Sequence, residues 1–259
     1  MADHLLVQIS DIHLTLDGPL SPYSRPRHNL MAALAALEES GLRPDVLILT
    51  GDLANAGDPA CYQDLAGIMD DASSRLGSLV VYLPGNHDLR PAFRRHLLGQ
   101  PEAPGPVNQV HWHDGLRIVA LDTSVPGEDA GLLTPESIEF LATSLSDPAP
   151  DGTIVAVHHP PVASPIGPMA RIMLRNPEAL AATIEGRDVR LVIAGHNHHE
   201  TAGTLGGAPV WVSPASAYRL DVLSREATRG VPGCALSRID VGVAGTTVHV
   251  IEVPLPTGT

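Results

Sequence analysis

The sequence predicts an α/β domain. Short apolar runs of strand type alternate with longer segments rich in Ala and Leu that repeat at helical spacing. The composition, 44% hydrophobic and 17% charged, is that of an ordinary globular protein. The 24 prolines are spread through the 259 residues rather than gathered into a linker, so we expect one domain over residues 1–259.

The predicted strands are the short apolar runs. In chain order they are Leu5–Ser10, Val46–Thr50, Leu79–Leu83, Arg117–Asp122, Ile154–His158, Leu191–Ala194, Val210–Ser213, Ala235–Val241 and Thr246–Val253. The last two flank a turn at Ala244 and Gly245, which is typical of a β-hairpin.

The predicted helices are Arg27–Ser40, Pro59–Leu76, Pro135–Leu145 and Pro177–Glu185. The last three begin with proline, which is tolerated in the first turn because the N–H that it lacks would have no partner there. Residues 162–176 and 217–233 do not fit the alternation and are too long for simple connections. We expect lids, substrate walls or subunit contacts there, with mobile surface loops as the alternative.

Charge and cysteine content restrict the partners and the compartment. A formal net charge of −13 disfavours binding to nucleic-acid polymers and anionic membranes. Cys61 and Cys234 match no metal or disulfide pattern, so we interpret both as reduced packing residues. The chain has no secretion signal near Met1 and no run approaching ~20 apolar residues, so we expect a cytoplasmic protein.

Groups of polar residues suited to metal binding follow five of the predicted strands, where open α/β sheets place their sites. The groups are Asp11 with His13, Asp52, Asn86 with His87 and Asp88, His158 with His159, and His196 with His198. Gly51, Gly85 and Gly195 each precede a group, which indicates sharp turns or close backbone approach. Turn preference alone would explain Asp52 and Asn86, but it does not explain the histidines.

The ligand types indicate a catalytic centre with two metal ions. Two carboxylates, one amide and four imidazoles suit Mn, Fe, Zn or Co rather than Ca or an iron–sulfur cluster. Seven protein ligands are too many for one ion that keeps an open position, but they suit two ions if one carboxylate bridges them.

The same motifs resemble, in order, the five blocks of the calcineurin-like metallophosphoesterase superfamily: Asp11-x-His13, Gly51-Asp52, Gly85-Asn86-His87-Asp88, His158 and Gly195-His196-x-His198. The segments Leu121-Asp122-Thr123 and Gly131-Leu132-Leu133 resemble its class III cyclic-nucleotide phosphodiesterase branch. The resemblance implies a four-layer sandwich in which two mixed β-sheets pack face to face with helices outside.

The resemblance also implies a ligand set. Asp11, His13 and His198 would hold one ion, and Asn86, His158 and His196 the other, with Asp52 as the bridge. Iron and manganese are the expected metals, with zinc or cobalt as alternatives. The roles of His159, His199 and Glu200 stay open, and we assign no site to His4, His28, His96, His111, His113 and His249.

We expect a metal-bound hydroxide to attack phosphorus in line, so no Ser or Cys nucleophile is needed. His87 would protonate the leaving oxygen, with Asp88 orienting it, and Asn86, His87 and His198 would contact the substrate. The alternative for His87 is a hydrogen bond to Asp11 or to a metal-bound water.

The resemblance implies 3′,5′-cyclic AMP or a related small diester as substrate, and a homodimer is plausible. The alternatives are a glycerophosphodiesterase or a broad phosphodiesterase that includes 2′,3′-cyclic nucleotides. Two less favoured hypotheses are a non-catalytic scaffold and a metal-dependent hydrolase of another ester or amide.

Overall fold

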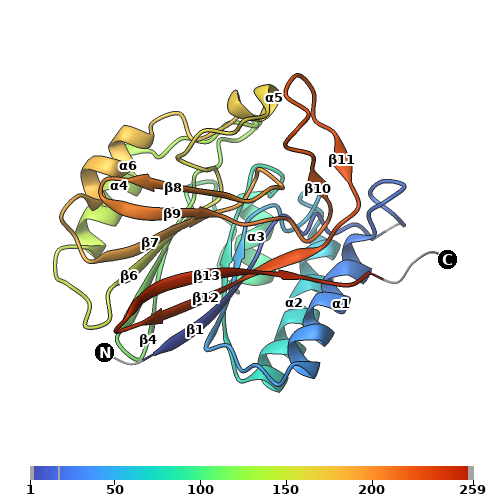
Figure 1. The fold of residues 1–259 in the computed structure, drawn as a ribbon, viewed down its shortest axis with the longest axis horizontal. Coiled ribbons are helices and arrows are strands. Elements are labelled where there is room, and N and C mark those ends of the chain that lie inside the picture. Colours follow the sequence, from blue (N-terminus) through green and yellow to red (C-terminus); the bar gives the residue numbers. More distant parts are fainter. Residues whose placement is uncertain (1–2, 17, 256–259) are drawn as a thin grey trace.

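Two mixed β-sheets form the centre of the computed structural model, which describes residues 3–16 and 18–255 (Figure 1). The five-stranded sheet has the spatial order β13 (Gly245–Glu252), β12 (Ala235–Gly242), β1 (His4–Ile9), β2 (Val46–Thr50) and β3 (Leu79–Leu83). Its strands β1, β2 and β3 are parallel, and β12 runs antiparallel to β1 and to β13.

The six-stranded sheet has a parallel centre and antiparallel edges. Its spatial order is β4 (Gln109–His113), β5 (Leu116–Leu121), β6 (Thr153–Val157), β7 (Val189–Ala194), β9 (Ala208–Val212) and β8 (Thr201–Leu205). The parallel strands are β5, β6, β7 and β9. A short separate pair, β10 (Arg219–Leu220) and β11 (Gly230–Val231), lies near α5 (Gly167–Ala170) in Figure 1.

Helices cover the outer faces of both sheets. The helices α1 (Pro26–Glu39), α2 (Pro59–Leu76) and α3 (Arg90–Leu97) lie on the side of the five-stranded sheet, and α4 (Pro135–Ser144) and α6 (Pro177–Ile184) on the side of the other. Among the described residues, no helix is long and apolar enough to cross a membrane.

Strand periodicity explains the layers, because successive side chains of a strand point to opposite faces. Leu47 and Leu49 of β2 pack with α1 and α2 in one buried cluster, whereas Ile48 joins a second cluster with Ile118 of β5 and Ile154 of β6. The second cluster is the core between the two sheets. A third lies between the six-stranded sheet and the helices α4 and α6.

The predicted sandwich of two mixed sheets is confirmed. All nine predicted strands and all four predicted helices are present, with ends within two residues of those expected. The predictions omitted α3, α5, β4, β8, β10 and β11. The strands β4 and β8 were missed because they are edge strands with few fully buried residues, and α3 because its sequence is largely basic.

Candidate metal centre

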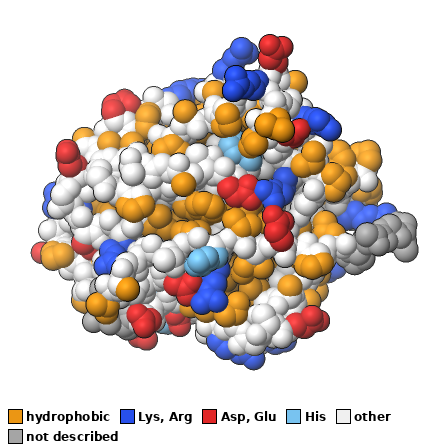
Figure 2. All heavy atoms as spheres, in the orientation of Figure 1, with side chains coloured by type: hydrophobic (Ala, Val, Ile, Leu, Met, Phe, Trp, Pro, Cys, Tyr) orange, Lys and Arg blue, Asp and Glu red, His pale blue; other side chains and the backbone are white. Residues whose placement is uncertain are grey.

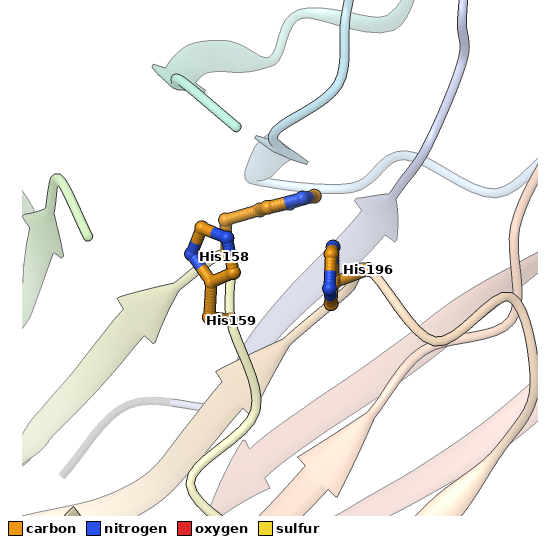
Figure 3. Close-up of side chains that lie close together, drawn as sticks. All are labelled: His158, His159 and His196. Atoms are coloured by element: carbon orange, nitrogen blue, oxygen red, sulfur yellow. The ribbon is translucent and has the colours of Figure 1, made fainter. Parts of the chain in front are cut away.

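The carboxyl ends of five parallel strands meet at one edge of the two sheets, and the predicted ligands gather there. Asp11 and His13 follow β1, Asp52 follows β2, Asn86 follows β3, His158 follows β6, and His196 and His198 follow β7. Figure 3 shows His158 beside His196 in this region, each carried by the loop after its strand. All seven residues are buried except Asn86, which is partly exposed.

The backbone at this edge is held in an unusual conformation. Asp11, His13, Asp52, His196 and His198 all have positive φ, between 49° and 68°. Non-glycine residues adopt this region at a conformational cost, and such residues cluster at functional sites. Among the described residues, Asp114 is the only other non-glycine residue with positive φ. The strain is therefore concentrated on the predicted ligands.

The three glycines before the ligand groups allow close approach. A Cβ at Gly85 would clash with the carboxylate of Asp52, and one at Gly51 would clash with the ring of His158. A Cβ at Gly195 would clash with the hydroxyl of Ser10. The residues after these glycines can reach the centre only because no side chain occupies that space.

Asp11, His13 and His198 form one group of ligands. Their donor atoms lie within 4.8 Å of one another. Nε2 of His13 is 3.1 Å from Nε2 of His198, which in turn is 3.5 Å from Oδ1 of Asp11. Asp11 also accepts hydrogen bonds from the hydroxyl of Ser10 and the backbone N–H of His196, so its carboxylate is fixed in place.

His158, His196 and Asn86 form the second group. Nε2 of His158 lies 3.2 Å from Oδ1 of Asn86, and the rings of His158 and His196 are 5.0 Å apart between centroids. Nε2 of His196 is buried and has no hydrogen-bond partner among the described residues. An unsatisfied buried nitrogen is costly, and a metal ion would satisfy it.

Asp52 lies between the two groups. Its Oδ1 is 3.3 Å from Nε2 of His158, and its Oδ2 is 3.5 Å from Nε2 of His13. Burial alone would raise the pKa of Asp52. The charge of His158 and its hydrogen bond to Asp52, with smaller contributions from His13 and His87, together more than offset burial, so the pKa lies well below its usual range. Burial likewise would lower the pKa of His158, which Asp52 instead raises to about 9.

Hydrogen bonds away from the centre fix which nitrogen each ring presents. Nδ1 of His158 donates to the carbonyl of Thr50 over 2.8 Å, and Nδ1 of His198 donates to the carbonyl of Tyr218 over 3.1 Å. Nδ1 of His13 is 3.3 Å from Oδ1 of Asn55. Metal-binding histidines are usually held by such a bond to the second nitrogen.

The protonation of His13 and His198, the two histidines of the first group, indicates whether a metal ion suits the space between them. Burial lowers the pKa of both His13 and His198 to about 4, so both rings are neutral at neutral pH. Because each Nδ1 carries the proton, the two Nε2 atoms face each other at 3.1 Å as two lone pairs. A metal ion bound by both Nε2 atoms would remove the repulsion between the two lone pairs. The residues of this group therefore suit a metal ion.

His87 lies at the open side of the centre with 40% of its side chain exposed. Its Nδ1 donates to the carbonyl of Asn55 over 2.7 Å, and its Nε2 is 4.0 Å from Oδ2 of Asp52. The ring of His87 also meets that of His13 edge to face, with 4.7 Å between centroids.

Asp88 has a different environment from the one expected. Its buried carboxylate accepts hydrogen bonds from the backbone N–H groups of Leu53, Ala54 and Gly85, and from the hydroxyl of Tyr62. Burial and the nearby charge of Asp52 raise the pKa of Asp88 to about 6. These contacts join two ligand loops, and they do not support the expectation that Asp88 orients His87.

The second histidine of the His158–His159 pair has both ring nitrogens engaged. Nδ1 of His159 lies 2.7 Å from the hydroxyl of Thr123, and Nε2 lies 3.1 Å from the carbonyl of Asp129. The rings of His158 and His159 leave the chain in different directions (Figure 3), at 84° between their planes. The ring of His159 also packs against that of His196, so its contacts indicate support of the ligand loops.

His199 and Glu200 connect the centre to the two unusual segments. Nε2 of His199 is 3.0 Å from the hydroxyl of Ser164, in the segment 162–176. Glu200 forms an ion pair with Arg219, in the segment 217–233. Both residues therefore contact the segments that flank the metal centre.

The metal centre opens into a cavity of about 480 Å³. The segment 162–176 contributes Met169 and Ile172, and the segment 217–233 contributes Tyr218 and Leu220. The two segments contact each other, because the N–H of Gly167 donates to the carbonyl of Arg225 over 2.8 Å. Their described residues thus form one wall of the cavity.

Three contributors to the site were not anticipated from the sequence. Asn55 contacts both His13 and His87, Tyr218 packs its ring 4.3 Å from that of His198, and Tyr23 lines the cavity. The proximity of Asn55 to Asp52 in the sequence was the one available signal. Nothing in the sequence around Tyr23 or Tyr218 distinguished these residues from ordinary loop residues.

The chain belongs to the calcineurin-like phosphoesterase family, because the model of that family matches residues 4–200. A cAMP/cGMP dual specificity phosphodiesterase of Mycobacterium tuberculosis is 40% identical over 99% of this chain and 81% of its own length. The glycerophosphodiester phosphodiesterase GpdQ of Enterobacter lignolyticus is 29% identical over 83% of this chain and 78% of its own.

A solved structure shows the same fold. The dimetal phosphatase of Danio rerio superposes with a TM-score of 0.64, covering 97% of this chain and 99% of its own, at 14% identity. The family assignment and the cluster of His and Asp side chains agree with the expectation of a centre for two metals.

Proposed function

We propose that this protein hydrolyses small phosphodiesters, 3′,5′-cyclic AMP first among them, at a centre of two metal ions. The observation that carries the proposal is the position of Asp52. Its two oxygens lie 3.3 Å from Nε2 of His158 and 3.5 Å from Nε2 of His13, one toward each group of ligands. A carboxylate so placed can be shared between two ions.

The proposed ligands are those expected from the sequence: Asp11, His13 and His198 for one ion, Asn86, His158 and His196 for the other, and Asp52 for both. When bound, the two ions would neutralise the charge of the phosphate and acidify a water molecule. We infer iron and manganese as the pair. Zinc and cobalt are the alternatives, because sets of nitrogen and oxygen ligands discriminate poorly among these metals.

His87 is the proposed proton donor to the leaving alkoxide. In this proposal water attacks phosphorus in line, and the alcohol leaves from the opposite side. The carbonyl of Asn55 accepts from Nδ1 of His87 and so directs Nε2 toward the centre. Asn86, His87 and His198 all line the cavity and are the proposed contacts to the phosphate.

The walls of the cavity favour a nucleotide over a glycerol diester. Tyr23, Tyr218, Met169 and Ile172 give the cavity aromatic and aliphatic surface, which suits a flat base better than a polar choline or glycerol group. The name of the relative from M. tuberculosis supports the same substrate class. The relationship to GpdQ keeps a glycerophosphodiester as the second candidate.

The partners of the protein follow from this proposal. A small diester fits the net charge of −13 better than a nucleic-acid polymer or a membrane does. On the face drawn in Figure 2, Arg side chains are dispersed among acidic and hydrophobic ones rather than gathered into a band. We infer a cytoplasmic location, which the two buried, reduced cysteines support, and we retain a homodimer as a hypothesis.

The test is a comparison of substrates on one preparation. Metal-depleted protein is loaded with Mn²⁺, and turnover of 3′,5′-cyclic AMP, 3′,5′-cyclic GMP, 2′,3′-cyclic AMP, glycerophosphocholine and bis(p-nitrophenyl) phosphate is measured, with Asp52→Ala as the inactive control. We expect the highest kcat/KM for a 3′,5′-cyclic nucleotide. A higher value for glycerophosphocholine would support the second candidate. Absence of metal-dependent turnover of any diester would indicate a scaffold.

A further inference from the structure

A second cluster of potential metal ligands lies at the opposite edge of the sheets. His4 begins β1, Asp45 directly precedes β2, and His113 ends β4. Because β1 and β2 are parallel and β4 runs antiparallel to β5, these three positions share the edge where the parallel strands begin. Figure 1 shows the start of β1 next to β4, on the side of the molecule away from α5 and β10.

The donor atoms of the three side chains converge. One atom each from His4, Asp45 and His113 lies within 4.8 Å of the others. The rings of His4 and His113 meet edge to face with 5.8 Å between centroids. His4 lies in the five-stranded sheet, Asp45 stands directly before its strand β2, and His113 lies in the six-stranded sheet, so the cluster spans the interface between the sheets.

His4 already has the hydrogen bond that fixes a metal-binding histidine. Its Nε2 donates to Oδ2 of Asp151 over 2.9 Å, and both side chains are buried. A neutral ring with its proton on Nε2 carries its lone pair on Nδ1, which is then available to an ion. Carboxylate–histidine pairs of this kind orient the ring and raise its basicity as a ligand.

His113 and Asp45 also have lone pairs that are available to a metal ion. Nδ1 of His113 is buried and has no hydrogen-bond partner among the described residues. Asp45 accepts the backbone N–H of Leu5 through Oδ2 over 2.7 Å, and a carboxylate has further lone pairs for a cation. A buried imidazole nitrogen without a partner is costly unless a ligand satisfies it.

A surface hollow gives access to His4 and Asp45. It measures about 390 Å³ and is lined by His4 and Asp45 together with Asp3 and Asp240. The carboxylates at this edge attract cations, although Asp240 also pairs with Arg238 at 2.7 Å.

We propose that His4, Asp45 and His113 bind a divalent cation of the zinc type, separate from the two-metal centre, that holds the two sheets together. Two imidazoles and one carboxylate are a ligand set for zinc, and water would complete the coordination. The site lies at the edge of the sheets opposite the cavity that would receive the substrate, so we assign it no part in that reaction. The proposal therefore does not depend on the proposed phosphodiesterase activity.

The test measures zinc stoichiometry and thermal stability rather than activity. Metal-depleted full-length protein is titrated with Zn²⁺ by calorimetry, and bound zinc is counted by mass spectrometry after dialysis. We expect three ions per chain for the wild type and two for His113→Ala. His111→Ala, which changes a histidine of the same strand outside the cluster, should keep three.

A second variant controls for the possibility that His113→Ala loses zinc only because it misfolds. Asp45→Asn retains an oxygen to accept the N–H of Leu5 but weakens the ligand, so it should fold and bind two ions. Both cluster variants should lose the part of the zinc-induced rise in Tm that His111→Ala retains, while Mn²⁺-dependent turnover of bis(p-nitrophenyl) phosphate stays at the wild-type level. Because the proposed site is separate from the two-metal centre, the deciding quantity is the difference between variants: a His113→Ala or Asp45→Asn variant that binds as many zinc ions as the wild type would overturn the proposal.

Discussion

His87 and Asn55 are joined by a hydrogen bond of 2.7 Å from the ring Nδ1 to the backbone carbonyl. Because a carbonyl can only accept, the proton of a neutral His87 lies on Nδ1 and Nε2 carries the lone pair. To act as an acid, His87 must therefore be protonated on Nε2 as well. Nε2 lies 4.0 Å from Oδ2 of Asp52, and 40% of the His87 side chain is exposed.

The first prediction is that His87→Ala lowers kcat without removing metal. General acid assistance is typically worth ~10²–10⁴ in rate, so we expect about a hundredfold loss for a cyclic nucleotide, whose leaving alkoxide needs a proton. The loss should be far smaller for bis(p-nitrophenyl) phosphate, because p-nitrophenolate leaves without one. Metal content and kcat are measured on the same preparations.

The matched control for His87→Ala is His96→Ala, which changes a partly exposed histidine of α3 outside the site. Equal losses on both substrates would instead indicate that His87 positions the substrate. A variant that lacks metal would place His87 among the residues that hold the ions, as its proximity to His13 and Asp52 also allows.

The second prediction concerns the shared carboxylate. Asp52→Ala should abolish turnover and lower the occupancy of both ions, whereas Asn86→Ala should lower the occupancy of one. The reason is geometric: Asp52 contacts histidines of both groups, whereas Asn86 contacts His158 of the second group. The number of metal ions that each variant retains after dialysis distinguishes loss of both ions from loss of one. Two tightly held ions in Asp52→Ala, with near-normal turnover, would exclude a bridging role.

The third prediction uses a pair of glycines. A Cβ at Gly85 would overlap the carboxylate of Asp52, whereas a Cβ at Gly67, on the exposed face of α2, would meet nothing within 4 Å. Gly85→Ala should therefore lose metal and activity. Gly67→Ala should keep both and raise the free energy of unfolding by about 0.5–1 kcal/mol, because Ala is the better helix former. Normal metal binding by Gly85→Ala would show that the loop can move aside.

The sequence was sufficient for the architecture and for the set of candidate ligands because both depend on local patterns. An apolar run that ends in Asp11-Ile12-His13 indicates a strand followed by ligands, whatever the rest of the chain does. The alternation of Leu47, Ile48 and Leu49 similarly predicts a strand with two buried faces. These features need no knowledge of distant contacts.

The remaining features depend on contacts between segments far apart in the sequence. Asn55 looks like any turn residue until the loop after β2 places it against His13 and His87. His4 and His113 were each assigned no site, and they meet only because two separate sheets pack together. Asp88 was expected to orient His87, whereas the contacts that define its environment come from Leu53 and Ala54, which follow β2, and from Tyr62 of α2.

The fourth prediction is that both cysteines are unreactive in the native protein. Cys61 and Cys234 are buried thiols that form no disulfide, and burial raises the pKa of Cys234 to about 12. Because the thiolate is the nucleophile, Cys234 should react with an aromatic disulfide reagent near pH 8 about a thousandfold more slowly than an ordinary thiol. Unfolding in guanidinium should release two reactive thiols per chain. One or no released thiol would contradict the interpretation of both as reduced packing residues.

The fifth prediction separates a supporting role of Asp88 from a catalytic one. Its carboxylate accepts three backbone N–H groups and the hydroxyl of Tyr62, so both oxygens receive hydrogen bonds. An amide has nearly the same shape but only one oxygen, and its NH₂ group would face N–H donors. Asp88→Asn should therefore lower the free energy of unfolding by about 2–4 kcal/mol, as expected when buried donors lose their acceptor.

The consequences of Asp88→Asn for the site follow from the loops that the carboxylate joins. Leu53 and Ala54 follow Asp52, and Gly85 precedes Asn86, so loosening this connection should weaken metal binding. Any remaining loss of kcat should be the same for cyclic nucleotides and p-nitrophenyl esters once metal is saturating, unlike the loss in His87→Ala. Denaturant unfolding and substrate comparison together decide the role. A stable Asp88→Asn variant whose kcat falls only for substrates with poor leaving groups would indicate that Asp88 takes part in catalysis.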